Sequence, residues 1–179
     1  MRNEEMMEIE MPNGVQAEVK GNEVSVKGAL GTNTRRFNDS LLTVSVSGNK
    51  LSIVPAESKK LKEKSKTAEV SFAKAVRNDI DGVIKYYEAN MQTVSAHFPI
   101  SLEIKGDTLL IKNLIGERAP RTAYIVGKSK AEVKGQNLRI YGISKEEVSQ
   151  SAANVRRACR IRFKDTRIFQ DGLYFTPQQ

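Results

Sequence analysis

Apolar and polar residues alternate along two segments of the chain that match each other. Residues 15–31 align without gaps on residues 100–116, at an offset of 85. The apolar positions coincide and comprise Val15, Ala17, Val19, Val24 and Val26 in the first segment, and Ile100, Leu102, Ile104, Leu109 and Ile111 in the second. This alternation predicts strands, and the Gly21-Asn22 and Gly106-Asp107 pairs within it predict tight hairpin turns. The chain is therefore an internal duplication in which each copy opens with a hairpin.

A second hairpin and then a helix follow in each copy. The hairpins cover residues 42–54 and 131–140, with turn glycines at Gly48 and Gly135. Apolar residues then recur at spacings of three and four, which predicts helices with inward faces formed by Ala73, Val76, Ile80 and Val83 and by Val148, Ala152, Val155 and Cys159. The pattern predicts an α+β fold of two tandem copies, each a mainly antiparallel sheet covered by a helix. We place the domains at residues 1–88 and 89–179.

A capping signal marks the start of the second helix. Ser144-Lys-Glu-Glu147 fits a capping box, in which the Ser144 oxygen accepts from first-turn amides and the Glu147 side chain reaches back to Ser144. The first helix has no comparable signal. Residues 59–66 hold five lysines with Glu63 between them, and we interpret this run as a solvated loop or helix approach inside the first domain.

Charge is divided unevenly between the two copies. The chain of 179 residues carries a formal net charge of +8, with a pI near 9.6, which favours a polyanionic partner. Residues 1–92 hold 14 basic and 13 acidic side chains, whereas residues 93–179 hold 15 and 8. We therefore expect the C-terminal copy to be the main binding domain for such a partner and the near-neutral first copy to be mainly structural.

The sequence indicates a cytoplasmic protein. Its first ten residues are acidic and lack the apolar stretch of a secretory signal, and no window approaches 18 uncharged apolar residues. Cys159 is the single cysteine, so an internal disulfide is impossible. We expect no membrane partner.

Residues suited to catalysis are scarce. His97 is the single histidine and lies in the alternating run 94–98, where a position on a strand surface is expected; Cys159 falls on the apolar face of the second helix and is expected to be a core residue. Neither a triad nor a multi-ligand metal site can be assembled, and phosphate-binding glycine motifs are missing. Gly28-Ala-Leu-Gly31 imitates the loop of KH domains, but an alternating, strand-like run precedes it. We therefore expect no catalytic residue, cofactor, metal or small-molecule substrate.

Basic residues gather at the end of the second helix. Arg156 and Arg160 lie four residues apart on a face different from the apolar one, with Arg157 beside them. Residues 155–170 hold six basic side chains and one acidic one, more than a helix dipole explains. Arginine suits phosphate contacts and base stacking, so we interpret this region as a nucleic-acid contact. The aromatic residues that follow can stack on bases or fasten the tail to the core.

Three motifs resemble those of the large-subunit ribosomal protein six family, in its archaeal and eukaryotic form. They are the duplicated domain, Asn113-Leu-Ile-Gly-Glu-Arg118 followed by Pro120-Arg121, and Arg167-Ile-Phe-Gln-Asp-Gly-Leu-Tyr174. The Lys-Gly-rich ending of the bacterial branch is missing. The resemblance implies a structural protein of the cytoplasmic ribosome, without a cofactor, that binds large-subunit rRNA near the sarcin-ricin loop and the stalk base and contacts neighbouring ribosomal proteins.

The resemblance also implies which residues contact rRNA. Carried over by position, they are Lys112, Arg118, Arg121, Arg156, Arg157, Arg160, Arg162, Lys164, Arg167 and Tyr174. Two other functions remain as alternatives: a free-standing RNA chaperone or regulator that uses the same basic surface, and an enzyme that depends on His97.

Overall fold

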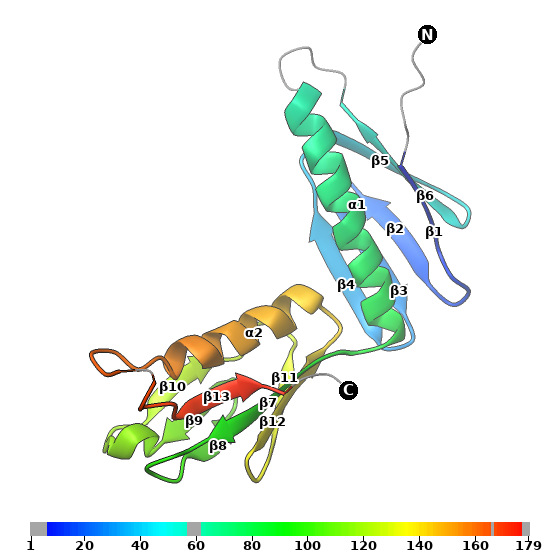
Figure 1. Ribbon diagram of the computed structural model, residues 1–179. Coiled ribbons are helices and arrows are strands. Elements are labelled where there is room, and N and C mark those ends of the chain that lie inside the picture. The colour runs from blue at the N-terminus through cyan, green and yellow to red at the C-terminus, as the bar shows by residue number, and fades with distance from the viewer. Residues whose placement is uncertain (1–6, 57–61, 166, 177–179) are drawn as a thin grey trace. The chain divides into compact units, whose positions relative to one another are not determined.

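A computed structural model of the chain describes residues 7–56, 62–165 and 167–176. Its residues form two compact units, Met1–Tyr86 and Tyr87–Gln179. The division lies after Tyr86, whereas the boundary expected after residue 88 falls inside the first strand of the second unit. Figure 1 shows that each unit combines strands with one long helix.

The first unit contains two three-stranded antiparallel sheets covered by one helix. Sheet β2-β3-β4 and sheet β1-β6-β5 both pack against α1. The elements are β1 (Met7–Glu10), β2 (Gln16–Lys20), β3 (Glu23–Gly28), β4 (Gly31–Arg36), β5 (Leu42–Ser47), β6 (Lys50–Pro55) and α1 (Lys62–Ile84). Helix α1 therefore begins within the lysine run, and residues 59–61 of that run lie outside the described residues.

The second unit repeats this plan and adds a strand after its helix. Sheet β8-β9-β10 and sheet β11-β12-β7-β13 are antiparallel, and α2 packs on β10, β12 and β7. The elements are β7 (Tyr87–Val94), β8 (Ser101–Lys105), β9 (Thr108–Lys112), the 3-10 turn η1 (Leu114–Gly116), β10 (Arg121–Tyr124), β11 (Lys130–Lys134), β12 (Asn137–Gly142), α2 (Lys145–Ala158) and β13 (Gly172–Phe175). The pairing of β13 with β7 joins the end of the unit to its beginning.

The α+β class and the covering helices are confirmed, but the expected order of four strands and a helix is incomplete. Each unit opens with a single strand, β1 or β7, its first hairpin is followed by a third strand, β4 or β10, and the strands form two sheets. All four expected hairpins are present, as two-residue turns in which a glycine stands first. In these turns only the glycine has a positive φ, for example 59° at Gly21 and 60° at Gly135, the arrangement of a type II′ turn.

The predicted core positions are buried. Val76 and Val83 of α1 and Val155 of α2 have no exposed surface, and Cys159 is 6% exposed. The core of the second unit adds residues from both of its sheets, including Leu109, Ile111, Leu138, Ile140 and Leu173. Gly28-Ala-Leu-Gly31 joins strands β3 and β4, unlike a loop between two helices.

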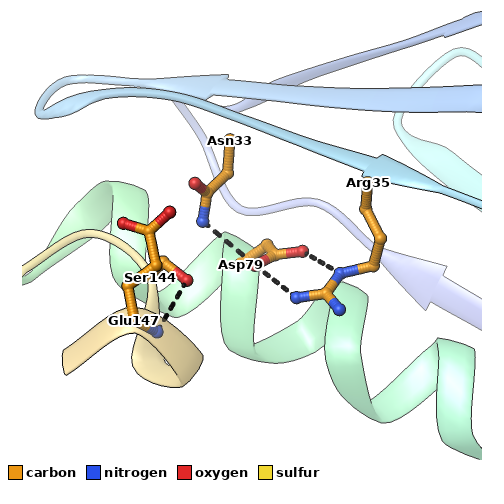
Figure 2. A network of polar contacts seen from close by, with 5 residues as sticks. All are labelled: Asn33, Arg35, Asp79, Ser144 and Glu147. Carbon is orange, nitrogen blue, oxygen red and sulfur yellow. Dashed lines mark hydrogen bonds and ion pairs between the residues drawn. The ribbon is translucent and has the colours of Figure 1, made fainter. Parts of the chain in front are cut away.

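A polar group interrupts the apolar face of α1. The Asp79 side chain, 5% exposed, accepts from Nε of Arg35 at 2.7 Å and from Nδ2 of Asn33 at 3.0 Å, as Figure 2 shows. Both partners lie on β4. Because a buried carboxylate requires such partners, this network ties the helix to the edge strand of its sheet.

Candidate nucleic-acid interface

Helix α2 begins with the predicted cap. Ser144 has an extended backbone, and its hydroxyl accepts from the Glu147 amide at 3.4 Å, a contact drawn in Figure 2. The other half of the expected capping box is wrong. The Glu147 carboxylate accepts from the backbone amide of Lys128 at 2.8 Å and lies so close to Gly127 that a Cβ there would overlap it. Glu147 therefore fixes the loop before β11 to the start of α2.

The other end of α2 presents unpaired arginines. Arg156 and Arg157 occupy the last turn, Arg160 follows the Cys159 cap, and all three are exposed. Within the described part of the chain, none of the three guanidinium groups has a hydrogen-bond or ion-pair partner. The helix dipole favours cations at this end of α2. Their N–H donors remain available to a ligand, because the dipole does not occupy them.

Arg121 differs from this group because its guanidinium is occupied. It contacts both Glu117 oxygens, at 2.7 and 2.5 Å, and its Nη1 donates to the carbonyls of Ala158 and Arg160 at 2.9 Å each. The hydrogen bond from Arg121 lowers the pKa of the Glu117 carboxyl, and the same bond raises the pKa of Arg121. Arg121 thus connects β10 to the orphan carbonyls where α2 ends.

Two basic residues on the sheets of the second unit are also paired with acids. Lys112, at the end of β9, forms an ion pair with Glu103, and this hydrogen bond lowers the pKa of the Glu103 carboxyl. Arg139 on β12 donates to both oxygens of Glu88, at 2.6 and 3.1 Å. Arg118, between η1 and β10, is exposed and has no partner within the part of the chain that is described. Lys112 and Arg139 therefore have acidic partners that, among the described residues, Arg118 and the arginines at the end of α2 lack.

The tail between α2 and β13 is fastened to the segment after β7. The Asp171 side chain is fully buried; its Oδ1 accepts from the backbone amides of Ala96 and His97, at 2.7 and 3.2 Å, and its Oδ2 lies 2.8 Å from His97 Nδ1. Burial raises the pKa of Asp171, but the hydrogen bonds from His97 and Ala96 outweigh it and leave that pKa lowered. The expectation that His97 lies on a strand is wrong, because β7 ends at Val94.

Some aromatic side chains of the tail pack against the domain, and others are exposed. The Phe169 ring stacks on the His97 ring, with centroids 4.9 Å apart, and Lys164 Nζ lies 4.9 Å from the Phe169 centroid. Phe163, by contrast, is fully exposed, and Tyr174 on β13 is half exposed. Arg162 and Arg167 are exposed too, and their guanidinium groups are unpaired among the described residues.

Two long-range contacts and one exposed aromatic residue were not predicted from the sequence. The Asp171–His97 contact joins residues 74 apart, and Arg121 reaches carbonyls 37 and 39 residues away, so no local pattern announces either. Phe163 was not predicted as a site residue, although its place among Arg160, Arg162 and Lys164 was a readable signal.

The described residues offer few groups suited to catalysis or to metal binding. Burial raises the pKa of the Cys159 thiol to about 11, so the thiolate is scarce at neutral pH. Among residues 7–56, 62–165 and 167–176, the acidic, histidine and cysteine side chains form no group of three suited to a metal ion. None of the helices in these ranges is both long and apolar enough to cross a membrane.

Fold and surface together define a class of small duplicated α+β proteins with a dense group of unpaired arginines at one helix end and in the tail that follows it. Comparison with known proteins identifies the family. The family model described as Ribosomal protein L6 matches residues 11–85 and again 98–172. The chain belongs to the ribosomal protein L6 family.

Individual relatives agree with the family match. The chain is 40% identical to "Large ribosomal subunit protein uL6" of Methanocella arvoryzae over 98% of both chains. The proteins of the same name from Methanobrevibacter smithii and Haloarcula marismortui are 39% and 35% identical to it, over 96% and 95% of this chain and 95% and 94% of their own lengths. These findings confirm the archaeal-type resemblance, the large-subunit ribosomal class and the cytoplasmic, ribosomal location. The family is one of structural proteins.

Proposed function

We propose that this chain binds large-subunit rRNA as a structural constituent, mainly through its second unit and near the sarcin-ricin loop and the stalk base. The observation that carries the proposal is the set of unpaired arginines at the end of α2 and in the tail. Their density distinguishes them: residues 155–170 hold six basic side chains and one acidic one, and the arginines among them have no acidic partner in the described part of the chain, whereas Arg139 is paired with Glu88. The second unit also carries most of the excess positive charge.

The proposed contact set follows from the pairing just described. Unpaired cations neutralise phosphates and release counterions, while the packed sheet and helix fix their spacing. The set comprises Arg118, Arg156, Arg157, Arg160, Arg162, Lys164 and Arg167, with Tyr174 beside them. Lys112 joins it by exchanging Glu103 for a phosphate. Arg121 differs from them because its Nη1 donates to two carbonyls at the end of α2, so we assign it a positioning role.

A charge reversal with a matched control tests the proposal. The full-length triple variant R156E/R157E/R160E is compared with K66E/K74E/R77E, which makes the same charge change on exposed positions of α1. Filter binding to large-subunit rRNA is measured over a range of salt concentrations. We expect the first variant to lose nearly all affinity and the control to bind almost as well as the wild type.

Salt dependence identifies the cause of the loss. A milder variant, R156Q/R157Q/R160Q, removes three phosphate contacts, so the slope of log affinity against log salt falls by roughly two to three. Equal losses in the α1 control, or an unchanged slope in the glutamine variant, would refute the assignment of the surface. Sedimentation at high salt separates the alternatives: a protein that remains with large subunits is a constituent, whereas a free pool indicates a chaperone or regulator.

A further inference from the structure

Phe163 stands out among the side chains of the second unit. It lies in the tail between α2 and β13, with a relative exposure of 103% and a φ of +61°. Bulky residues rarely adopt a positive φ, because the side chain crowds the backbone, and such residues concentrate at functional sites. In the described parts of the chain the Phe163 ring contacts no other ring. The fold therefore holds an apolar ring in solvent without using it for packing.

The surroundings of Phe163 are cationic. Arg160 and Arg162 precede it, both exposed and unpaired among the described residues, and Lys164 follows it. The second aromatic residue of the tail, Phe169, is already engaged with His97 and Lys164. The tail thus has one aromatic ring that fastens it to the domain and a second that is available to a ligand.

We propose that Phe163 stacks on an unpaired base of large-subunit rRNA, while the flanking arginines contact the adjacent phosphates. The inference rests on the proposed rRNA binding and names the kind of nucleotide that is bound. A base in a loop or bulge offers a free face for stacking, whereas a base inside a duplex does not. An apolar protein surface fits this site poorly, because contact with it would desolvate the neighbouring cations without compensation.

The affinity of ring-deleted variants tests the proposal. F163A and F163G both remove the ring, and glycine also relieves the positive φ, so equal losses in the two identify the ring as the cause. We expect each to bind large-subunit rRNA roughly 5- to 150-fold more weakly, the range for one stacked base, with F163Y close to the wild type. The salt slope should stay unchanged, because no phosphate contact is removed.

A spectroscopic test does not depend on affinity. The chain has no tryptophan, so F163W introduces a single indole at the proposed stacking position. We expect its fluorescence to be quenched when saturating rRNA is added. The control I84W places an indole on a half-exposed position at the end of α1 in the first unit, where no quenching is expected.

The outcomes separate this inference from the proposed function. A wild-type chain that fails to bind rRNA refutes both. A wild-type chain that binds, with F163A equally tight and F163W unquenched, refutes the stacking alone. If F163A binds free rRNA normally but enters large subunits poorly, the ring contacts a protein, and the inference is again overturned.

Discussion

Replacement of Arg121 by alanine should loosen the end of α2 while removing no direct phosphate contact. The two bonds from Nη1 to the carbonyls of Ala158 and Arg160 are charge-assisted, a type worth about 1.5–3 kcal/mol each in protected sites. The Arg121 side chain is 26% exposed and Glu117 is 41% exposed, so the ion pair between them adds little. After discounting for this exposure, we expect a loss of about 1.5–3 kcal/mol for the last turn of α2.

Cys159 provides the assay, because it caps α2 beside these carbonyls. Its thiol is buried, with a pKa raised to about 11, so a thiol reagent at pH 8 modifies it only when the helix end opens. The expected loss corresponds to a rise of roughly 10- to 150-fold in the labelling rate of R121A. R121K should lie in between, since an ammonium retains the charge but lacks the planar fork.

Arg118 supplies the control, and rRNA binding decides between the two roles of Arg121. R118A should leave the labelling rate unchanged and lower the salt slope of rRNA binding by about one, as expected for one phosphate contact. R121A should weaken binding with a smaller change in slope. If R121A instead labels like the wild type and lowers the slope by about one, Arg121 is an rRNA contact and the positioning role is refuted.

Three further substitutions test the rest of the fold. D171N removes a carboxylate whose pKa is lowered in the folded state. The stabilising effect of this carboxylate is present above about pH 4 and is lost as the pH falls through the lowered value. The difference in free energy of unfolding between wild type and D171N, measured with urea, should therefore shrink from pH 6 to pH 3. D79N leaves Arg35 without its carboxylate and should cost about 2–4 kcal/mol, less than a fully buried pair because Arg35 is 21% exposed, measured by hydrogen exchange of α1 amides. G28A places a Cβ 2.7 Å from Cγ2 of Val83 and should destabilise the first unit by about 1–3 kcal/mol in the same exchange experiment, whereas an unchanged protection pattern would mean that Val83 moves aside without cost.

Local patterns were sufficient for much of the fold. Period-two alternation and glycine turns identified four hairpins, and spacings of three and four identified both helix faces, because each of these signals lies within one element. The opening strands β1 and β7, the strands β4 and β10 that follow the first hairpin of each unit, and the closing strand β13 were missed. The pairings of β1, β7 and β13 span many residues, for example Leu173 with Thr93, and such pairings leave no mark in a short window.

The candidate site divides in the same way. The cluster of arginines at residues 156–162 is visible in the sequence. Whether each guanidinium is paired with another group depends on residues that are distant in the sequence. Arg121 and Arg118 look alike in the sequence, yet one is occupied by Glu117 and two carbonyls and the other is exposed. Asp171 lies in the closing motif that indicated the family, and the structure gives it a physical reason: it accepts from the amides of Ala96 and His97.

The pairing of β13 with β7 has a consequence for synthesis. All elements of the first unit lie before residue 87, so this unit can fold while the rest of the chain is still being translated. The four-stranded sheet of the second unit is completed later, since β7 pairs with β12 and also with β13, which is made after the other elements. At roughly 5–20 residues per second, its opening strand waits several seconds for β13. The tail that presents the arginines is consequently anchored at both ends only after β13 has been made, so a shorter nascent chain does not display the finished surface.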